Sequence, residues 1–366
     1  MPYTTVADHL RRTQAAGLTW PLPDGITDAE LEARLFGPPA ACGPAGLTGT
    51  QSAAAIRNPA PLSLASPTAT PTPVPTARVF PSATPTATAT ATATATPPPS
   101  PTPLPSPTAT RDPATMVNGV PVEDIVVMPP EVVVNVQRIF DQGQALGRNP
   151  RAFSKLGDSI SLTSHYLARF DQGRYNLGIY EDLQPTVDHY DHSFERFGVA
   201  VRIGLHAWVA FHPGEADPTL CRPDEHMVGC ELRLHNPSVL LIRLGTNDTA
   251  QGDAFERAIR HTVEYSIEQG VIPVLVTKSD RFEGDNRNNE TLRRLAAEYA
   301  IPLWDFDVAA GTLPDRGLGA DGVHLTSFDS DDYSNPATLA FGFPLSDLTG
   351  LFTLDAIRRV VAGSAG

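Results

Sequence analysis

Apolar and polar positions follow two different periods in the last two thirds of the chain. Short apolar runs that are almost free of charge predict buried strands, and apolar residues three or four positions apart predict amphipathic helices. The predicted strands are 152–156, 199–203, 238–244, 271–277 and 301–304, and the predicted helices are 130–140, 255–269 and 290–300. In the first helix we expect Val133, Val136 and Phe140 to face the core, and we expect Gly270 to cap the second helix.

Strands that alternate with helical segments are typical of parallel βαβ units. Strands without a regular polar alternation indicate a sheet that is covered on both faces. The pattern therefore predicts an α/β domain over residues 115–366, built on a five-stranded parallel sheet between helices.

A different composition precedes this domain. Pro59–Pro113 contains 16 Pro, no Gly and three charged residues, and the rest is mostly Thr, Ala and Ser. Such a segment buries too little apolar surface to offset the entropy lost on ordering it. We predict a disordered Pro/Thr/Ala-rich linker over residues 38–114, so that a long disordered arm leads into the domain.

Residues 1–37 carry a short helical pattern of their own. The strings Thr5-Val-Ala-Asp-His-Leu, Trp20-Pro-Leu-Pro-Asp-Gly and Asp28-Ala-Glu-Leu-Glu-Ala-Arg-Leu-Phe resemble the N-terminal region of insertion-sequence transposases that carry a DNA-binding helix-turn-helix. The catalytic part of such an enzyme does not follow. We interpret residues 1–37 as a transposase-like fragment, left by a gene fusion or a misplaced start, rather than as a working DNA-binding module.

The charge distribution limits the partners of the chain. The formal net charge is −14, and residues 1–114 carry six acidic and six basic side chains, so the excess falls on the domain. Nucleic-acid surfaces need clustered Lys and Arg, and the chain has only Lys155 and Lys278 as lysines. We therefore expect no nucleic-acid partner. The chain has no stretch of 18 consecutive apolar residues, so we also expect no stable membrane insertion. As a separate expectation, the protein is a monomer.

Two features disagree about localisation. The first 30 residues lack the basic start and apolar core of a secretory signal. Thr/Pro-rich stalks, however, are typical of exported chains. We expect an extracytoplasmic or cell-surface protein on the strength of the linker.

Three polar motifs lie where ligands bind in α/β domains. Gly157-Asp158-Ser159 and Gly245-Thr246-Asn247-Asp248 directly follow predicted strands, and Asp321-Gly-Val-His324 lies downstream. The carboxyl ends of parallel strands form the usual ligand-binding edge of an open sheet. A Ser hydroxyl becomes nucleophilic when a neighbouring His accepts its proton and a carboxylate orients that His. The spacing of Asp321 and His324 predicts that one turn brings them into contact.

In this order the motifs resemble the SGNH (GDSL-type) serine hydrolases, and the resemblance covers roughly residues 117–362. It implies a three-layer α/β/α flavodoxin-like sandwich, hydrolysis of carboxylic esters of lipids, sugars or small alcohols, and no cofactor. The implied catalytic residues are Ser159, Asp321 and His324. The implied oxyanion hole consists of Asn247 and the amides of Ser159 and Gly204, although the flanks of Gly204 depart from the usual pattern. The resemblance is greatest to bacterial extracytoplasmic members with Thr/Pro stalks.

Metal binding is the less favoured interpretation of two further clusters. His189 and His192 lie close together in a polar segment, and the spacing of Cys221, His226 and Cys230 permits zinc, but a fourth ligand is not apparent. A disulfide between Cys221 and Cys230 is favoured in an exported domain, which leaves Cys42 unpaired. We expect no metal.

The sequence therefore predicts a serine esterase that acts on an ester substrate through an acyl-enzyme intermediate. An acyltransferase to a sugar hydroxyl would use the same triad and remains an alternative. A non-catalytic carbohydrate- or surface-binding module on the stalk is the alternative from another class. Residues 278–287, which follow a predicted strand, either shape the substrate pocket or form an ion-paired loop.

Overall fold

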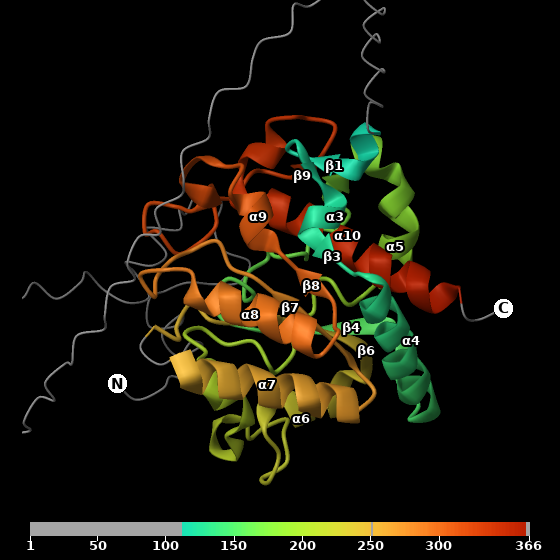
Figure 1. The fold of residues 1–366 in the computed structure, drawn as a ribbon, viewed down its shortest axis with the longest axis vertical. Coiled ribbons are helices and arrows are strands. Elements are labelled where there is room, and N and C mark those ends of the chain that lie inside the picture. The colour runs from blue at the N-terminus through green and yellow to red at the C-terminus, as the bar shows by residue number, and fades with distance from the viewer. Residues whose placement is uncertain (1–111, 250–251, 364–366) are drawn as a thin grey trace, which may run out of the picture. The chain divides into compact units, whose positions relative to one another are not determined.

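The computed structural model describes residues 112–249 and 252–363, and Figure 1 shows how their elements are arranged. The predictions for residues 1–37 and 38–111, and Cys42, lie outside the described residues. The described chain folds as an α/β structure with a five-stranded sheet, which confirms the predicted fold class.

The α-helices are α3 (Val122–Ile125), α4 (Pro130–Ala145), α5 (Gln184–His189), α6 (Met227–His235), α7 (Gly252–Glu268), α8 (Arg287–Glu298), α9 (Phe306–Ala310) and α10 (Gly342–Ala362). The strands are β1 (Met116–Val117), β2 (Val120–Pro121), β3 (Val126–Val127), β4 (Asn149–Gly157), β5 (Tyr175–Asn176), β6 (Pro237–Arg243), β7 (Ile272–Val276), β8 (Leu303–Trp304) and β9 (Asp331–Asp332). Short 3-10 segments are η1 (Pro113–Thr115), η2 (Gly178–Leu183), η3 (Ala207–Phe211), η4 (Pro213–Glu215), η5 (Pro314–Gly317) and η6 (Thr338–Ala340).

The central sheet has the strand order β3-β8-β7-β6-β4. Neighbouring strands from β4 to β8 are parallel, whereas β3 runs antiparallel to β8. The sheet is therefore mixed and not wholly parallel as predicted. Every residue of β6 and β7 is buried, as expected for strands that are covered on both faces.

Helices cover the two faces of this sheet. Helices α7 and α8 pack side by side and both contact β7, while α4 contacts α10, which also packs against β3 and β8 (Figure 1). The sheet thus forms the middle layer of three. This layering places the carboxyl ends of β4, β6 and β7 along one edge, and the loops that leave that edge carry the polar motifs.

The predicted strand 199–203 is not a strand of the sheet. Val201 makes one isolated parallel bridge to Gly157, supported by the Gly157 amide, which donates to the Ala200 carbonyl at 3.2 Å. Ala200 and Val201 are buried, but Ile203 is 59% exposed, so the buried run is too short to extend the sheet. The fifth strand is β3, a two-residue edge strand that periodicity does not single out.

The three predicted helices are present as α4, α7 and α8. The turn after α7 has Gly270 at a φ of 65°, the left-handed conformation typical of a helix C-cap, as predicted. No helix within residues 112–249 and 252–363 is long and apolar enough to cross a membrane.

The apolar stripe of α4 differs in phase from the prediction. Its buried side chains include Val132, Val136 and Ile139, whereas Val133 and Phe140 are only partly buried. Consecutive valines at the start of the helix permit either phase. Packing against the sheet and α10 selects the one that buries Val132.

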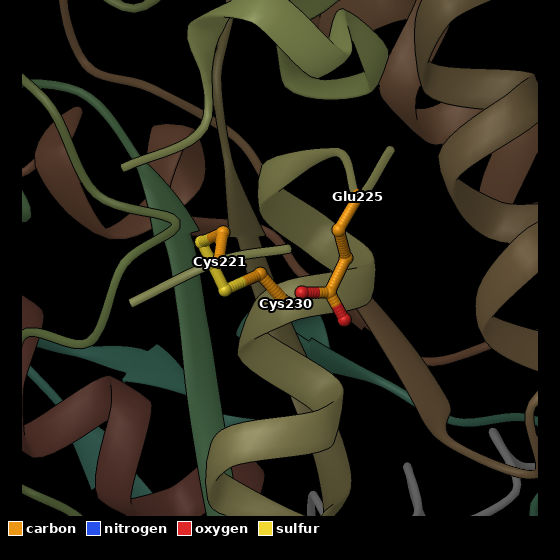
Figure 2. Close-up of side chains that lie close together, drawn as sticks. All are labelled: Cys221, Glu225 and Cys230. Carbon is orange, nitrogen blue, oxygen red and sulfur yellow. A yellow bond between two sulfur atoms is a disulfide. The ribbon is translucent and has the colours of Figure 1, made fainter. Parts of the chain in front are cut away.

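Cys221 and Cys230 form a disulfide, with 2.09 Å between the two sulfur atoms (Figure 2). Cys221 lies in the irregular segment before α6, and Cys230 lies on α6 itself. The bridge ties this segment, which has little regular structure of its own, to a helix that packs against β4.

We expect loss of this bridge to destabilise the domain. A closed loop over residues 221–230 contributes about 2.7 kcal/mol by the chain-entropy estimate. The double variant Cys221→Ala/Cys230→Ala should therefore lower the Tm by roughly 5–10 °C in a thermal melt. The variant Cys42→Ala, which leaves the bridge intact, serves as the control. An unchanged Tm in both the double variant and the reduced protein would contradict the prediction.

Candidate active site

The structure brings Ser159, His324 and Asp321 into one hydrogen-bonded line. Ser159 Oγ lies 3.0 Å from His324 Nε2, and His324 Nδ1 lies 2.6 Å from Asp321 Oδ2. The side chains of His324 and Asp321 are about half exposed, so solvent and small molecules reach them. The arrangement is that of a nucleophile, a base and a carboxylate that orients the base.

The Asp321 carboxylate also builds the loop that carries His324. Its Oδ1 accepts hydrogen bonds from the amides of Val323 at 2.9 Å and of His324 at 3.0 Å, while Oδ2 contacts the imidazole. Partial burial opposes ionisation of this carboxyl, but the hydrogen bonds from the His324 side chain and the two amides outweigh it. The pKa of Asp321 is therefore below its usual range, and the carboxylate stays charged beside the imidazole.

Gly157 provides space at the end of β4. It is the last residue of the strand, and its φ is not in the positive range that favours glycine, so close packing rather than backbone conformation requires a glycine here. A Cβ at this position would collide with the Ser161 side chain and lie 3.2 Å from the Arg243 carbonyl oxygen. The glycine thus allows the segment that carries Ser159 to fold back closely over the ends of β4 and β6.

Asp158, directly before Ser159, is buried and makes no hydrogen bond to the triad among the described residues. Its Oδ1 accepts a hydrogen bond from the Ile160 amide at 3.1 Å. This bond closes a short turn around Ser159, because Asp158 and Ile160 are its two neighbours in the chain. Burial raises the pKa of Asp158 to about 6, and the Ile160 hydrogen bond and the nearby Arg243 charge only partly offset it.

The loop of Asn247 is joined to the loop of Gly204. Asn247 Nδ2 donates to the Leu205 carbonyl at 3.3 Å, and both Asp248 carboxylate oxygens accept from the Ala207 amide at 3.1 and 3.2 Å. Gly204 has a φ of 69°, which L side chains rarely adopt. Two loops that are separated in the sequence therefore form one unit beside β4.

Two backbone amides of this region are available to a ligand. Within the described part of the chain, neither the Ser159 amide nor the Gly204 amide donates a hydrogen bond to protein. Asn247 uses its amide nitrogen, which carries two hydrogens, for one bond to Leu205. These donors are the kind that stabilise an oxyanion.

A buried ion-paired group is hydrogen-bonded to the Asn247 loop through Thr246. Thr246 Oγ1 donates to Asp280 Oδ2 at 2.9 Å, and Lys278 Nζ contacts Asp280 Oδ1 at 2.7 Å and Glu283 Oε2 at 2.5 Å. All three ionic side chains are buried. Residues 278–287 therefore form an ion-paired loop, and no sequence motif connects this loop with Thr246.

A second buried ion pair links the segment after Ser159 with the segment after His324. Arg169 Nη1 lies 2.7 Å from Asp331 Oδ1, with both side chains 1% exposed, and Arg169 also donates to the Phe328 carbonyl. Sequence reasoning missed this pair because its members are 162 positions apart and neither lies in a recognisable motif.

The residues considered for metal binding serve other contacts. Cys221, Cys230 and Glu225 form the one group within metal-ligand distance among the described residues (Figure 2), but the sulfurs are bonded to each other and are not thiolates. His226 Nδ1 accepts from the Gly229 amide at 3.1 Å and caps α6, and His189 Nε2 contacts the Pro150 carbonyl at 2.9 Å. His226 and His189 are therefore engaged in other contacts.

No protein family model matches the chain. A Sinorhizobium fredii protein named as transposase y4uI is 61% identical over 36 residues at the N-terminus, which is 10% of this chain and 7% of that protein. This match agrees with the resemblance noted for residues 1–37 and does not reach the domain.

Several solved structures are similar to the chain. A two-domain esterase active on acetylated mannans is 18% identical, with a TM-score of 0.39, over 61% of this chain and 53% of that one. A psychrotrophic esterase from Pseudoalteromonas is 14% identical, with a TM-score of 0.36, over 56% of this chain and 97% of its own. A GDSL-like lipase from Bacteroides thetaiotaomicron is 14% identical, with a TM-score of 0.34, over 62% and 98%. Two of these structures are named as esterases and the third as a GDSL-like lipase.

The raised pKa of Asp158 leads to a pH-dependent stability prediction. Between its ordinary value of 3.8 and about 6, the folded protein holds a proton at Asp158 that the unfolded chain has released. The stability from this group is therefore lost as the pH rises through that window. Asp158→Asn keeps the acceptor for the Ile160 amide and removes the titration. We expect the Tm of the variant to rise relative to that of the wild type between pH 4 and pH 7 in parallel thermal melts, whereas a constant difference would contradict the assignment.

Proposed function

We propose that the chain is a serine esterase that hydrolyses carboxylic esters through an acyl-enzyme intermediate on Ser159. The observation that carries the proposal is the unbroken line of hydrogen bonds from Asp321 through His324 to Ser159, at 2.6 and 3.0 Å. Binding alone does not require a hydroxyl, an imidazole and a carboxylate in this order, which counts against a purely carbohydrate-binding module.

In the first half-reaction, Ser159 Oγ attacks the ester carbonyl carbon while His324 Nε2 takes the hydroxyl proton. The carbonyl π electrons move onto oxygen, and the tetrahedral oxyanion accepts hydrogen bonds from Asn247 and from the amides of Ser159 and Gly204. When the intermediate collapses, the bond to the alcohol oxygen breaks and His324 donates the proton to the leaving alcohol. Throughout, the Nδ1–H group of His324 donates to the Asp321 carboxylate, which keeps its charge and stabilises the imidazolium.

In the second half-reaction, water takes the place of the alcohol. His324 Nε2 accepts a proton from water as its oxygen attacks the acyl carbon, and the same donors hold the second oxyanion. Collapse then breaks the bond to Ser159 Oγ, which recovers its proton from His324, and the carboxylic acid leaves. A sugar hydroxyl in place of water would give acyl transfer with the same residues, and product analysis with a sugar acceptor distinguishes the two outcomes.

We further propose that residues 115–366 form the hydrolase domain and that it works outside the cytoplasm. All the residues with proposed catalytic roles lie in this range. The Cys221–Cys230 disulfide supports the location, because disulfides persist in oxidising compartments and are rare in the cytosol.

We expect Ser159→Ala and His324→Ala each to lower kcat by about 10⁴–10⁶-fold, and the double variant to be little worse than either, because the residues act as a unit. The assay is hydrolysis of p-nitrophenyl esters of graded acyl length and of acetylated oligosaccharides, with thermal melts to show that the variants fold. Residual activity equal to that of the wild type on every ester that the wild type cleaves would overturn the triad.

We expect Asn247→Ala to lower kcat by about 10²–10³-fold, as for other oxyanion donors, with a smaller effect on KM. The matched control is Asn135→Ala. Asn135 lies on α4, and its amide donates to the Tyr299 and Ala300 carbonyls just before β8, at the opposite edge of the sheet. A rise in KM at unchanged kcat would instead make Asn247 a ground-state substrate contact.

A further inference from the structure

We propose that Asn288, on the first turn of α8, is a positioning residue for the oxyanion site and acts through Asn247. The proposal rests on the proposed esterase function, because it assigns Asn288 to the same reaction. Asn288 contacts none of the three residues of the triad in the hydrogen bonds of the described chain. Its positioning role follows from the two backbone carbonyls to which its side-chain amide donates.

Asn288 binds the Asn247 loop at both ends. Its Nδ2 donates to the Gly245 carbonyl at 2.8 Å and to the Asp248 carbonyl at 3.0 Å. These carbonyls enclose Thr246 and Asn247, so one side-chain amide spans the whole turn. Both hydrogens of the amide are used on this one loop, and the Asn288 side chain is 1% exposed.

The other contacts of the loop are made by its own side chains, Thr246 to Asp280, Asn247 to Leu205 and Asp248 to Ala207, and by hydrogen bonds within its own backbone. The loop follows the last residue of β6 and belongs to no helix or strand, so its carbonyl groups have no sheet partners. Buried carbonyls without partners cost free energy. Asn288 is the side chain from another segment that bonds to the Gly245 and Asp248 carbonyls, although the Gly245 carbonyl also accepts from the Asp248 amide at 3.3 Å. The two bonds from Asn288 therefore restrict the backbone on either side of Thr246 and Asn247, and this restriction limits the direction of the Asn247 side chain.

The effect of Asn288 extends to the second donor loop. Asp248, whose carbonyl Asn288 binds, holds the Ala207 amide with its carboxylate. Asn247 itself binds the Leu205 carbonyl. Gly204 therefore lies in a segment that is attached to the loop that Asn288 clamps. One buried amide thus fixes the relative positions of Asn247 and the Gly204 amide.

The buried environment of Asn288 supports a role beyond packing. Its Oδ1 is buried and has no hydrogen-bond partner among the described residues, which lowers stability relative to an apolar side chain of the same shape. The neighbouring Asn289 differs, because its amide group accepts from the Lys278 amide at 2.9 Å and donates to the Lys278 carbonyl at 2.8 Å. The two asparagines thus bind different loops, and only Asn288 bonds directly to the Asn247 loop.

The test is a double-variant cycle between Asn288 and Asn247 in the full chain. Asn288→Ala should lower kcat by about 10- to 100-fold, the scale expected for a misplaced catalytic group, with KM within about threefold. In the Asn247→Ala background, the same change should lower kcat by less than about threefold, because the group that Asn288 positions is already absent. Asn135→Ala, which also removes an amide that donates to two carbonyls, should leave kcat unchanged.

A second variant guards against a folding failure. Asn288→Leu keeps the number and branching of the side-chain atoms while removing both donors, and it should reproduce the kcat loss. Equal kcat losses in the wild-type and Asn247→Ala backgrounds would overturn the proposal, and so would a wild-type kcat in either folded Asn288 variant. Failure of the proposed function itself is a separate result, since Ser159→Ala would then retain full activity.

Discussion

The loops at the carboxyl edge of the sheet must satisfy their backbone polar groups without sheet partners, and the rest of the site depends on how they do so. Side chains provide the bonds that strands provide elsewhere. Asp321 holds the amides of its own loop, Asp248 holds the Ala207 amide, and Asn288 holds two carbonyls of the Asn247 loop. Because these bonds join one loop to another, the position of each candidate catalytic group is set by residues outside its own motif.

Buried charge is the second means by which the site is held. The Arg169–Asp331 pair and the Lys278–Asp280–Glu283 group are buried. Removing one partner from such a group leaves an unpaired buried charge, which is strongly destabilising. The Arg169–Asp331 pair joins the segments that follow Ser159 and His324, and Asp280 of the second group accepts a hydrogen bond from Thr246, beside Asn247. Disruption of either ionic group would therefore shift loops that carry the proposed catalytic groups.

The sequence predicted the local features of the site better than the long-range ones. Asp321 and His324 were predictable because their partners lie three residues apart, and Ser159 and Asn247 because their motifs follow apolar runs. The segment 199–203 failed as a strand because hydrophobicity does not reveal that the chain turns at Ile203, and β3 was missed because two residues show no period. Asn288 and Arg169 were not predicted, since their roles depend on partners 40 and 162 positions away.

The double use of the Asp321 carboxylate affects how this site would decay in evolution. Since Oδ1 shapes the loop and Oδ2 orients His324, a descendant that no longer needs catalysis would still need Asp321 for the loop. The side chains of Ser159 and His324 have no comparable structural contact among the described residues. We therefore expect these two positions to be substituted first. The presence of the aspartate in a diverged relative would therefore report an inherited loop conformation, whereas the proposed activity would require the serine and the histidine as well.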